Sequence, residues 1–574
     1  MIYESFHGLR ITVVEVVIFL TSFGVLLMTL RFVRPLIRPR WLDWVLGTQL
    51  RPVLLVIVAA MLARALLLPF AGVPEPRVND EFSYLLMADT FSHHRLTNQT
   101  PASWEHFETF HVNLRPTYHP MYPVAQGFAL AFGQALFHQP WIGVYLSTSL
   151  LCGAICWALW SFVTPLWALV GGLLAVMRIA LFGYWMNSYW GGSVAALGGA
   201  LALGAVVRLF DRDRENRSRK QLACVFAVAL LILATSRPYE GMAFSLPLLG
   251  YFAYNIARGR ISGAQMRATL LPVLGIGLLG IAMIGIYNHE TTGDALVMPY
   301  VLNHRTYWSL PFFLGEKGNP GLELPDPVFA KFMTITADAY GYEKTKTASG
   351  IATIELGRII INWFFYIGPA LTLPVLIGLR LCIGQPRLRI AVWATLFTAA
   401  AAALCLYNLV HYAAPATVVV YLLAVVGLRH LWDQKKNRWR ALVIAACITV
   451  VVASLTKQTG SEARLYTFHL RDGRKSVVQQ LQEKPGMHLV LVSYELERHY
   501  PASELVHNGA EFASQRILWA RSKGPERDAD LCLAFGDRAF WTLTTDDVSL
   551  RLKPLPLCKG NPDAQNQPHD FSPQ

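Results

Sequence analysis

The stretch "RPVLLVIVAAMLARALLLPFAGVPEPRVNDEFSYLLMADTF" (residues 51–91) joins a long apolar run to a pair of adjacent acids. The apolar part, residues 52–70, is long enough to cross a bilayer core about 30 Å thick. Similar runs recur along the 574 residues, of which 54% are hydrophobic and 15% charged. Soluble domains carry about 25% charged residues. The sequence therefore predicts an all-α polytopic membrane protein, and what Asp80 and Glu81 can do depends on its topology.

Five basic segments determine the predicted topology, because loops rich in Lys and Arg stay on the cytoplasmic side. They lie at residues 31–51, 208–220, 258–267, 380–389 and 429–440. An even number of crossings must then separate each neighbouring pair, which predicts about twelve spans with both termini outside. The predicted spans lie near residues 11–32, 52–70, 142–163, 166–183, 191–207, 221–236, 240–256, 268–288, 359–379, 390–408 and 412–428, with a last one before residue 456.

The weakest apolar run, residues 121–138, contains Gln126 and Gln134 and is predicted to lie in the membrane interface. Residues 71–140 and 289–358 are then outer loops of a transmembrane domain that covers residues 1–455. The formal net charge of +13 is explained by the positive-inside rule, so no nucleic-acid partner is predicted. The first run shows no cleavage-site pattern and is predicted to be a retained helix.

Residues 456–574 are predicted to form a small α/β domain outside the membrane. The runs HLVLVSY (488–494), RILWA (516–520) and FWTLTT (540–545) are typical of short strands. The polar tail GNPDAQNQPHDFSPQ is predicted to be disordered. Cys532 and Cys558 lie in this region, and they can form a disulfide if the compartment is oxidising.

Asp80 and Glu81 precede a helix-like run, and two interpretations compete. In the structural interpretation, Asp80 is the N-cap of the helix and Glu81 lies favourably in its first turn. In the functional interpretation, the two acids belong to a site. The rest of the loop favours the second interpretation, because it is rich in His, Arg, Trp and Tyr, whose side chains suit a sugar.

Three arginines, Arg64, Arg178 and Arg237, lie at the predicted outer ends of spans, against the positive-inside trend. A buried charge near a membrane face is costly and usually faces a partner or a cavity, although snorkelling to the headgroups is an alternative. Because arginine binds phosphate well, these positions predict an anion such as a lipid phosphate. A carboxylate that accepts a hydroxyl proton, with cations that stabilise a departing phosphate, suits a single-displacement, inverting transfer.

Four motifs resemble those of the GT-C fold membrane glycosyltransferases that use polyprenyl-phosphate sugars, such as the protein O-mannosyltransferases and the lipid A aminoarabinose transferases. They are NDEFSYLLMADTF (79–91), YHPMYP (118–123), YWMNSYWGGS (184–193) and TSRPYEG (235–241). The resemblance covers about residues 50–310 in order and topology, and it implies a bacterial inner-membrane enzyme with a periplasmic active site. The chain departs from the family at Asn187 and Ser188, where relatives often have a second acid, and at His119–Pro120, where relatives have two prolines.

The resemblance implies that Asp80 is the catalytic base, and Glu81 is predicted to assist it or to cap the helix. The residues predicted to bind the donor phosphate are Arg237, Arg115, His119 and Arg178. The residues predicted to contact the substrate are Tyr84, Tyr118, Asn187, Tyr239, His304 and Arg305. No metal ligands are predicted, but the resemblance leaves a divalent cofactor, Mg²⁺ or Mn²⁺, open. The predicted partners are a polyprenyl-phosphate-linked sugar, membrane lipid, and an acceptor that is a glycan, a lipid or a protein.

Three other functions are left open by the residues alone. A transporter or flippase of a lipid-linked glycan is expected to have repeated halves with broken helices at the midplane, and we find no convincing repeat. A metal-dependent hydrolase or transferase is suggested by crowded histidines in the first outer loop, although no H-E-x-x-H spacing is present. These are His93, His94, His106, His111 and His119. A non-catalytic scaffold leaves the outer arginines unexplained.

Overall fold

The structure is a computed structural model that describes residues 2–29, 39–211, 215–324, 326–434, 436–456, 470–495, 504–545 and 550–556. The chain folds into two compact units, each built from three segments far apart in the sequence. Unit 1 consists of Met1–Pro74, Trp141–Ala282 and Lys344–Leu465, and unit 2 consists of Glu75–Pro140, Met283–Glu343 and Tyr466–Gln574. The first predicted outer loop, most of the second and the C-terminal region therefore fold as one unit.

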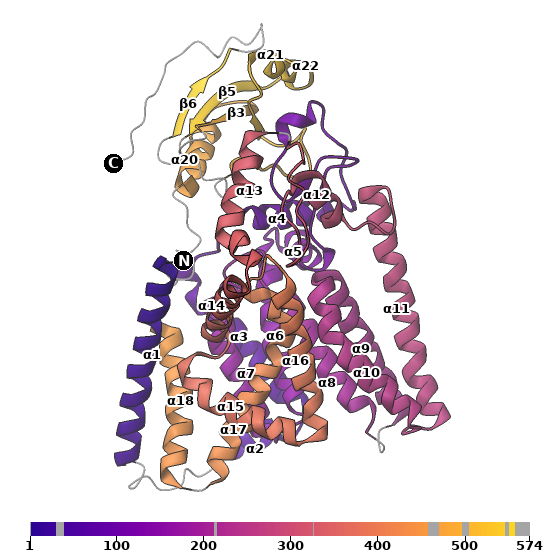
Figure 1. Cartoon of the computed structure of the whole chain (residues 1–574), viewed down its shortest axis with the longest axis vertical. Helices are drawn as coiled ribbons and strands as arrows, with labels where there is room; N and C mark the ends of the chain where they lie inside the picture. Colours follow the sequence, from indigo (N-terminus) through magenta and orange to yellow (C-terminus); the bar gives the residue numbers. More distant parts are fainter. Residues whose placement is uncertain are drawn as a thin grey trace. The chain divides into compact units, whose positions relative to one another are not determined.

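Unit 1 is helical, as expected for apolar segments that must satisfy their own backbone hydrogen bonds in lipid. Its α-helices are labelled in Figure 1. The elements have these bounds: α1 (Ile2–Thr29), α2 (Arg40–Leu46), α3 (Leu50–Ala71), α6 (Trp141–Leu159), α7 (Pro165–Ala175), η2 (Val176–Ala180), α8 (Ser193–Leu209), α9 (Asn216–Ser236), α10 (Pro238–Ala257), α11 (Gly263–Thr292), α14 (Ala348–Tyr366), α15 (Gly368–Gly384), α16 (Pro386–Leu404), η4 (Val410–Ala416), α17 (Thr417–Asp433) and α18 (Asn437–Thr456). The end of α11 belongs to unit 2.

Seven helices among the described residues are long and apolar enough to cross a membrane. They are Leu50–Ala71, Trp141–Leu159, Asn216–Ser236, Gly263–Thr292, Pro386–Leu404, Val410–Asp433 and Asn437–Leu455. Shorter apolar helices lie at three other predicted spans, Glu15–Thr29, Pro165–Ala180 and Ser193–Leu209. The helical membrane fold is thus confirmed, whereas the number of crossings and the side that each loop faces stay predictions.

The predicted span near residues 359–379 is not a single straight helix, and whether it crosses the membrane stays a prediction. Helices α14 and α15 meet at this position and are bent by 98° with respect to each other. The break lies at Ile367, and the next residue, Gly368, has φ 67°, a left-handed conformation that glycine adopts without strain. If the bent pair is one span, the number of candidate spans rises to eight.

Two glycines allow α15 and α17 to pack with their backbones in contact. A Cβ atom added at Gly378 would lie 1.9 Å from the carbonyl oxygen of Leu423, and one at Gly427 would lie 1.9 Å from that of Pro374. Small residues at the point of contact are the usual device for close helix packing in membranes, where apolar side chains gain little by leaving lipid.

Unit 2 combines short helices with a four-stranded sheet (Figure 1). Its elements are α4 (Asn79–Ser92), η1 (Trp104–Phe107), β1 (Val112–Asn113), β2 (His119–Pro120), α5 (Val124–Phe137), α12 (Pro299–Tyr307), α13 (Pro327–Tyr340), η3 (Tyr342–Lys346), α20 (Leu470–Gln482), β3 (His488–Tyr494), β4 (Ile517–Arg521), α21 (Pro525–Asp528), α22 (Leu531–Phe535), β5 (Ala539–Thr545) and β6 (Leu550–Pro554). Helix α5 confirms the helix predicted at residues 121–138, and its interfacial location stays a prediction.

The sheet has the order β4-β3-β5-β6, in which β3 is parallel to β4 and β5, and β6 is antiparallel to β5. The three predicted strands are confirmed, and they form a small sheet in the C-terminal region; the bounds of a separate C-terminal domain stay a prediction. Strand β6 was not predicted; it lies at the sheet edge and alternates leucine with Arg551 and Lys553, a pattern that is polar overall. Cys532 is disulfide-bonded. Its predicted partner Cys558 and the predicted disordered tail lie outside the described residues.

Alternate residues of β3 pack against different parts of unit 2. Leu489 and Leu491 share a core with side chains of the Glu75–Pro140 segment, including Leu86, Phe107 and Tyr118. Val490 and Val492 face the other way and share a core with α20 and with residues 505–506. Because successive side chains of a strand point to opposite faces, one face of the sheet is built directly on the segment that contains Asp80.

Candidate active site

The start of α4 gives the two adjacent acids different roles. The helix begins at Asn79, and Glu81 Oε2 accepts hydrogen bonds from the backbone N–H groups of Arg77 (2.6 Å) and Val78 (3.2 Å). Glu81 therefore satisfies donors that the first helical turn leaves unpaired, which is the capping role. The structural interpretation that made Asp80 the N-cap is wrong, because Asp80 lies inside the first turn and its carboxylate bonds elsewhere.

The Asp80 carboxylate is held by a tyrosine and a histidine. Tyr122 donates its hydroxyl hydrogen to Asp80 Oδ1, and His111 Nδ1 lies 3.6 Å from Asp80 Oδ2. The Tyr122 oxygen also lies 2.9 Å from His111 Nδ1. Since the one hydroxyl hydrogen of Tyr122 goes to Asp80, this second contact requires His111 Nδ1 to carry a hydrogen and donate it. The three side chains thus form a closed polar cluster.

Asp80 is partly exposed, whereas His111 is buried. Its side chain is 22% exposed, whereas the side chain of His111 is 9% exposed. Burial lowers the pKa of His111, and the nearby Asp80 charge opposes this shift only in part. His111 is therefore neutral at pH 7, since the usual histidine pKa of about 6.5 is already below that pH. A neutral His111 orients the carboxylate without cancelling its charge.

Aromatic packing fixes the two partners of Asp80. The ring of Tyr122 stacks on that of Tyr84, with centroids 4.6 Å apart. His111 lies near-parallel to Trp308 at 5.9 Å, and its carbonyl oxygen accepts a hydrogen bond from Ser83 Oγ (2.6 Å). Its backbone has φ 63°, in the left-handed region that is uncommon for residues other than glycine. Tyr84, predicted to contact substrate, supports Tyr122 in this arrangement.

The contacts of His119 do not favour its predicted role at the donor phosphate, which stays a prediction. Its side chain is fully buried, Nδ1 lies 2.9 Å from the carbonyl oxygen of Thr117, and Nε2 lies 2.9 Å from Asn113 Nδ2. Because the Asn113 amide donates to Nε2, that nitrogen must be unprotonated. Burial accordingly lowers the pKa of His119 to about 4, so the ring is neutral at pH 7.

Tyr118, the first residue of the motif YHPMYP, is buried, whereas Arg115, three residues before it, is exposed. Tyr118 is 3% exposed, and its hydroxyl donates to the carbonyl oxygen of Asn508 (3.0 Å), a core position that does not favour the predicted substrate contact. Arg115 is exposed and lies over the ring of Trp104 at 5.0 Å. Arg115 also lines a cavity of about 550 Å³ together with Trp104, Glu108, Asn113, Leu114, Pro116, Leu302, Thr306 and Tyr307. Its predicted contact with an anion therefore stays a prediction.

On α12, His304 is largely engaged within unit 2. Its Nε2 lies 2.7 Å from the carbonyl oxygen of Leu310, and its ring stacks on Phe312 with centroids 3.7 Å apart. Burial lowers the pKa of His304, which does not favour a cationic role. Arg305, the next residue, is exposed on the same helix. The predicted substrate contact is therefore better suited to Arg305 than to His304.

The other predicted site residues belong to unit 1. Arg178 lies 3.3 Å from Glu15 and donates to the carbonyl oxygens of Phe364 and Phe365, with its side chain 5% exposed. These contacts occupy the guanidinium and do not favour the predicted contact of Arg178 with the donor phosphate, which stays a prediction. Asn187 accepts a hydrogen bond from Arg64 Nη2 (3.1 Å), which makes this pair part of the helix packing.

The last two predicted residues, Arg237 and Tyr239, lie at the break between α9 and α10 and just after it. Arg237 is the residue that separates the two helices, and its guanidinium lies 4.6 Å from the ring centroid of Tyr412. Tyr239 lies in the first turn of α10 and is partly exposed. Asp80 belongs to unit 2, so a common site for Asp80 and these two residues stays a prediction.

The sequence leaves a divalent metal cofactor open, and the donor atoms near Asp80 show whether such an ion fits there. Within the ranges that the structure describes, no group of three or more His, Cys, Asp and Glu side chains is arranged so that it could hold a metal ion. Beside Asp80 the Glu81 carboxylate caps the helix, which leaves Asp80 and His111 as two donors. Mg²⁺ and Mn²⁺ prefer several oxygen ligands. This donor set does not fit such an ion, and we derive no step through one.

The sequence reasoning missed the two residues that bond to Asp80. Tyr122 lies within the motif YHPMYP, directly before Pro123, and His111 was considered only among the crowded histidines. The position of Tyr122, a polar aromatic residue just before helix α5, could have indicated a role in the site. Nothing in the local sequence distinguishes His111 from its neighbours, because its role depends on a left-handed backbone and on contacts with three other elements.

Comparisons with known proteins give a fold and no sequence relative. No protein-family model matches the chain, and no curated protein matches its sequence. Among solved structures, ArnT from Cupriavidus metallidurans in the apo state has 12% identity and a TM-score of 0.50, with 86% of this chain and 93% of that chain covered. The same protein bound to undecaprenyl phosphate gives a TM-score of 0.49, and an Archaeoglobus fulgidus oligosaccharyltransferase gives 0.45 at 11% identity, with 77% of this chain and 62% of that chain covered. The chain therefore has the GT-C fold of ArnT, as the sequence predicts.

Proposed function

We propose that this protein is an inverting glycosyltransferase that moves a sugar from a polyprenyl-phosphate donor to an acceptor at the outer face of the bacterial inner membrane. The observation that carries the proposal is the Asp80 cluster: a partly exposed carboxylate, oriented by Tyr122 and by a neutral His111, in a chain with the GT-C fold. The first-loop motif that contains Asp80 is also the one that resembles the base motif of that fold's glycosyltransferases.

In the proposed reaction Asp80 takes the proton from the acceptor hydroxyl. The acceptor oxygen forms a bond to the anomeric carbon as the bond from that carbon to the phosphate oxygen breaks. The polyprenyl phosphate leaves with the electron pair, and the proton stays on Asp80 until solvent removes it. One displacement inverts the anomeric carbon and needs one base. Tyr122 and His111 act by holding the carboxylate in the orientation that this transfer requires.

Arg237 is the strongest remaining candidate for the departing phosphate. It lies where the backbone breaks between two helices, and a guanidinium can contact a phosphate with two parallel hydrogen bonds. Arg115 is the second candidate, because it is exposed and lines the cavity of unit 2. His119 and Arg178 are weaker candidates, since the His119 ring is neutral and fully buried and the Arg178 guanidinium is already paired with Glu15.

The proposed location follows from topology and redox chemistry. Disulfides persist in oxidising compartments such as the periplasm and are rare in the cytosol. The disulfide-bonded Cys532 therefore supports a periplasmic position for the C-terminal region. The same position was predicted from the distribution of basic loops. The proposed partners are the polyprenyl-phosphate-linked sugar, membrane lipid, and a glycan, lipid or protein acceptor.

The test is sugar transfer from a panel of radiolabelled polyprenyl-phosphate sugars by membranes that contain wild type, Asp80→Asn or Asp294→Asn. Asp294 is an exposed carboxylate of unit 2 and serves as the matched control. We expect transfer with wild type and Asp294→Asn, and loss of transfer with Asp80→Asn. Full transfer by folded Asp80→Asn would refute its assignment as the base. No transfer from any donor, in an assay where a known transferase is active, would refute the enzyme class and leave the transporter ahead.

A further inference from the structure

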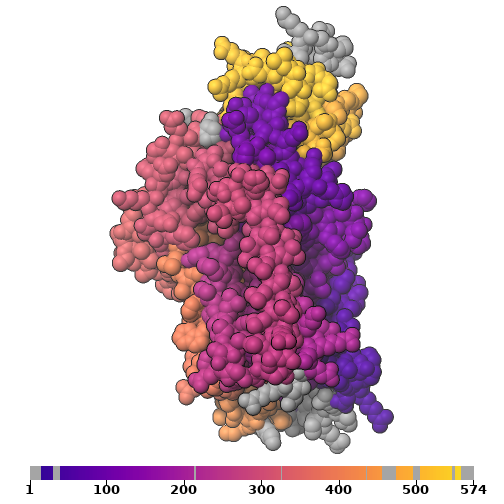
Figure 2. Space-filling view, turned by 90° about the vertical axis from the view of Figure 1, so that its right-hand side faces the viewer, coloured from indigo at the N-terminus to yellow at the C-terminus, as the bar shows by residue number. Residues whose placement is uncertain are grey.

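The C-terminal region contacts helix α4 at several points, all of them within unit 2. The ring of His507 stacks on Phe82 with centroids 4.0 Å apart and an angle of 4° between the planes. The backbone N–H of Ala510 donates to Asp89 Oδ2 (2.7 Å). Figure 2 shows the surface of the Glu75–Pro140 segment directly beside that of the C-terminal segment. The helix that carries Asp80 is thus fixed at its first turn and again near its end.

The segment that makes these contacts, residues 504–511, is itself held firmly. Glu504 is buried and accepts hydrogen bonds from Arg521 Nη2, the Tyr494 hydroxyl and the Val506 N–H. Asn508 exchanges two hydrogen bonds with the backbone of Trp519 in β4, at 2.8 and 2.9 Å. Residues 504–511 therefore have the rigidity that is needed to position another element.

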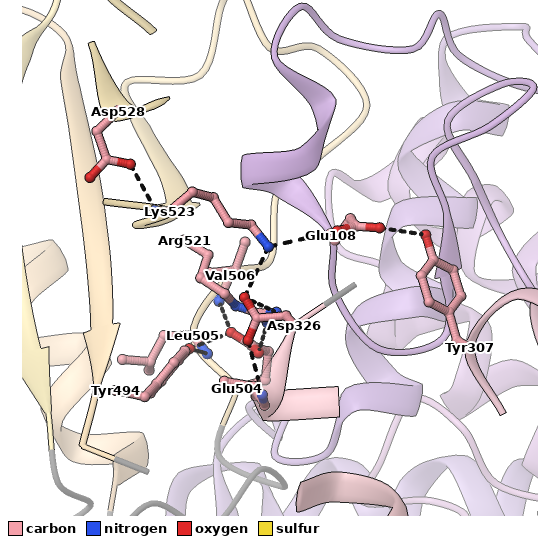
Figure 3. Close-up of polar contacts among 11 residues, drawn as sticks. Glu108, Tyr307, Asp326, Tyr494, Glu504, Leu505, Val506, Arg521, Lys523 and Asp528 are labelled. Atoms are coloured by element: carbon pink, nitrogen blue, oxygen red, sulfur yellow. Dashed lines mark hydrogen bonds and ion pairs between the residues drawn. The ribbon is translucent and has the colours of Figure 1, made fainter. Parts of the chain in front are cut away.

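A buried ion network ties the same region to the rest of unit 2. Lys523 Nζ lies 2.9 Å from Asp326 and 3.8 Å from Glu108, and Arg521 lies 3.7 Å from Asp326 (Figure 3). Glu108 also accepts a hydrogen bond from Tyr307 (3.3 Å). The network joins the three chain segments of the unit. Glu108 lies three residues before His111, so the network constrains the backbone from which His111 projects.

His507 lies between the two halves of the Asp80 cluster. Its ring stacks on Phe82, two residues after Asp80, and its Nδ1 lies 3.5 Å from Thr109 Oγ1, two residues before His111. His507 Nε2 is buried without a hydrogen-bond partner among the residues that the structure describes. A histidine ring in a packed site with an unsatisfied nitrogen is a costly choice for filling space alone. The ring is, however, in contact with both elements whose separation sets the geometry of Asp80 and His111.

We propose that His507 is a positioning residue for Asp80. It acts through Phe82 and Thr109 to hold α4 and residues 108–111 in a fixed relative position. The inference rests on the proposed role of Asp80 as the base. It gives the C-terminal domain a defined role, in which residues 504–511 complete the active site without contacting the substrate. A shift of the base by about 1 Å is enough to lower a rate by about 100-fold.

The test compares His507→Ala and His507→Phe with His488→Ala. Phenylalanine retains a flat ring for stacking on Phe82. His488 is a matched control because it is a buried histidine of strand β3 in the same unit. We expect His507→Ala to lower kcat by about 10- to 100-fold with donor and acceptor KM within about twofold. We expect His507→Phe to recover kcat to within about threefold of wild type, and His488→Ala to keep it within about twofold.

A second variant and a second measurement separate the possible failures. Phe82→Leu removes the same stacking contact from the other side, so its combination with His507→Ala is expected to lose no more than either change alone. Hydrogen–deuterium exchange of residues 80–92 is expected to rise in His507→Ala and not in His488→Ala. If kcat and exchange in His507→Ala match those of His488→Ala, the positioning role is wrong. If wild type transfers no sugar, the proposed function fails, while the exchange data still decide whether His507 fixes α4.

Discussion

The hydroxyl of Tyr122 is the most direct way to perturb Asp80 without removing it. Tyr122→Phe deletes the donor to Asp80 Oδ1 and the acceptor for His111 Nδ1, and it leaves the ring that stacks on Tyr84. A hydrogen bond to a charged group contributes about 1.5–3 kcal/mol, and about 1.4 kcal/mol corresponds to a tenfold change in rate. If that bond orients the base, we expect kcat to fall by about 10- to 100-fold with KM nearly unchanged.

The measurement is single-turnover sugar transfer by purified wild type, Tyr122→Phe, Asp80→Asn and the double variant. Tyr287→Phe is the matched control, because Tyr287 is buried in unit 2 and its hydroxyl has no hydrogen-bond partner among the described residues. Residues that act as one unit are not additive, so the double variant is expected to be no slower than Asp80→Asn. The reasoning would be refuted if Tyr122→Phe retained kcat within about twofold of wild type, or if the two losses multiplied.

Three further changes test the reassigned residues. Burial lowers the pKa of His119 to about 4. Below about pH 6.5 the unfolded chain binds a proton at this histidine and the folded chain does not. Acidification from pH 7 to 5 is therefore expected to lower the free energy of unfolding by about 2 kcal/mol. Denaturation of wild type and of His119→Gln at both pH values measures this, and the loss should be smaller in the variant. Glu81→Ala is expected to lower stability by about 1 kcal/mol while Glu81→Gln retains most of it, because an amide oxygen can still accept from the helix start; an equally large loss in both would contradict the capping role. Arg178→Ala leaves Glu15 buried without its partner and is expected to cost about 3–5 kcal/mol, partly restored by adding Glu15→Ala; a raised donor KM at unchanged stability would instead favour the phosphate role.

The membrane fold could be predicted from the sequence because it depends on composition over long windows. An apolar run such as residues 52–70 is long enough to span lipid wherever its neighbours lie, and α3 confirms it. The three strands β3, β4 and β5 could be predicted for a different reason, because each is a short local run of β-favouring residues. The bend between α14 and α15 could not be predicted in this way, because Gly368 differs from other helical glycines only in a backbone angle that its tertiary packing sets.

The site was predicted only in part, because most of its contacts join residues that are distant in the sequence. Asp80 was found through a local motif, and the structure places it at an accessible position. The roles of Arg178 and His119 depended on their partners instead. Glu15 lies 163 residues from Arg178, and Asn113 fixes the protonation of His119 through one amide. A residue type and its predicted side of the membrane do not reveal whether its hydrogen bonds are already made.

The adjacency of Asp80 and Glu81 bears on the stereochemistry of the proposed reaction. Successive side chains on a helix point about 100° apart, so two neighbouring acids in the first turn cannot both face one substrate. Glu81 Oε2 is bound to the two N–H groups before the helix, whereas Asp80 faces Tyr122 and His111. A retaining mechanism needs a second carboxylate about 5 Å away as nucleophile, and the helix start commits Glu81 to capping instead. The pair therefore supplies one base and one cap, and we expect the product to have the opposite anomeric configuration to the donor. A product of unchanged configuration, measured by NMR of the transferred sugar, would require a nucleophile that this arrangement does not provide.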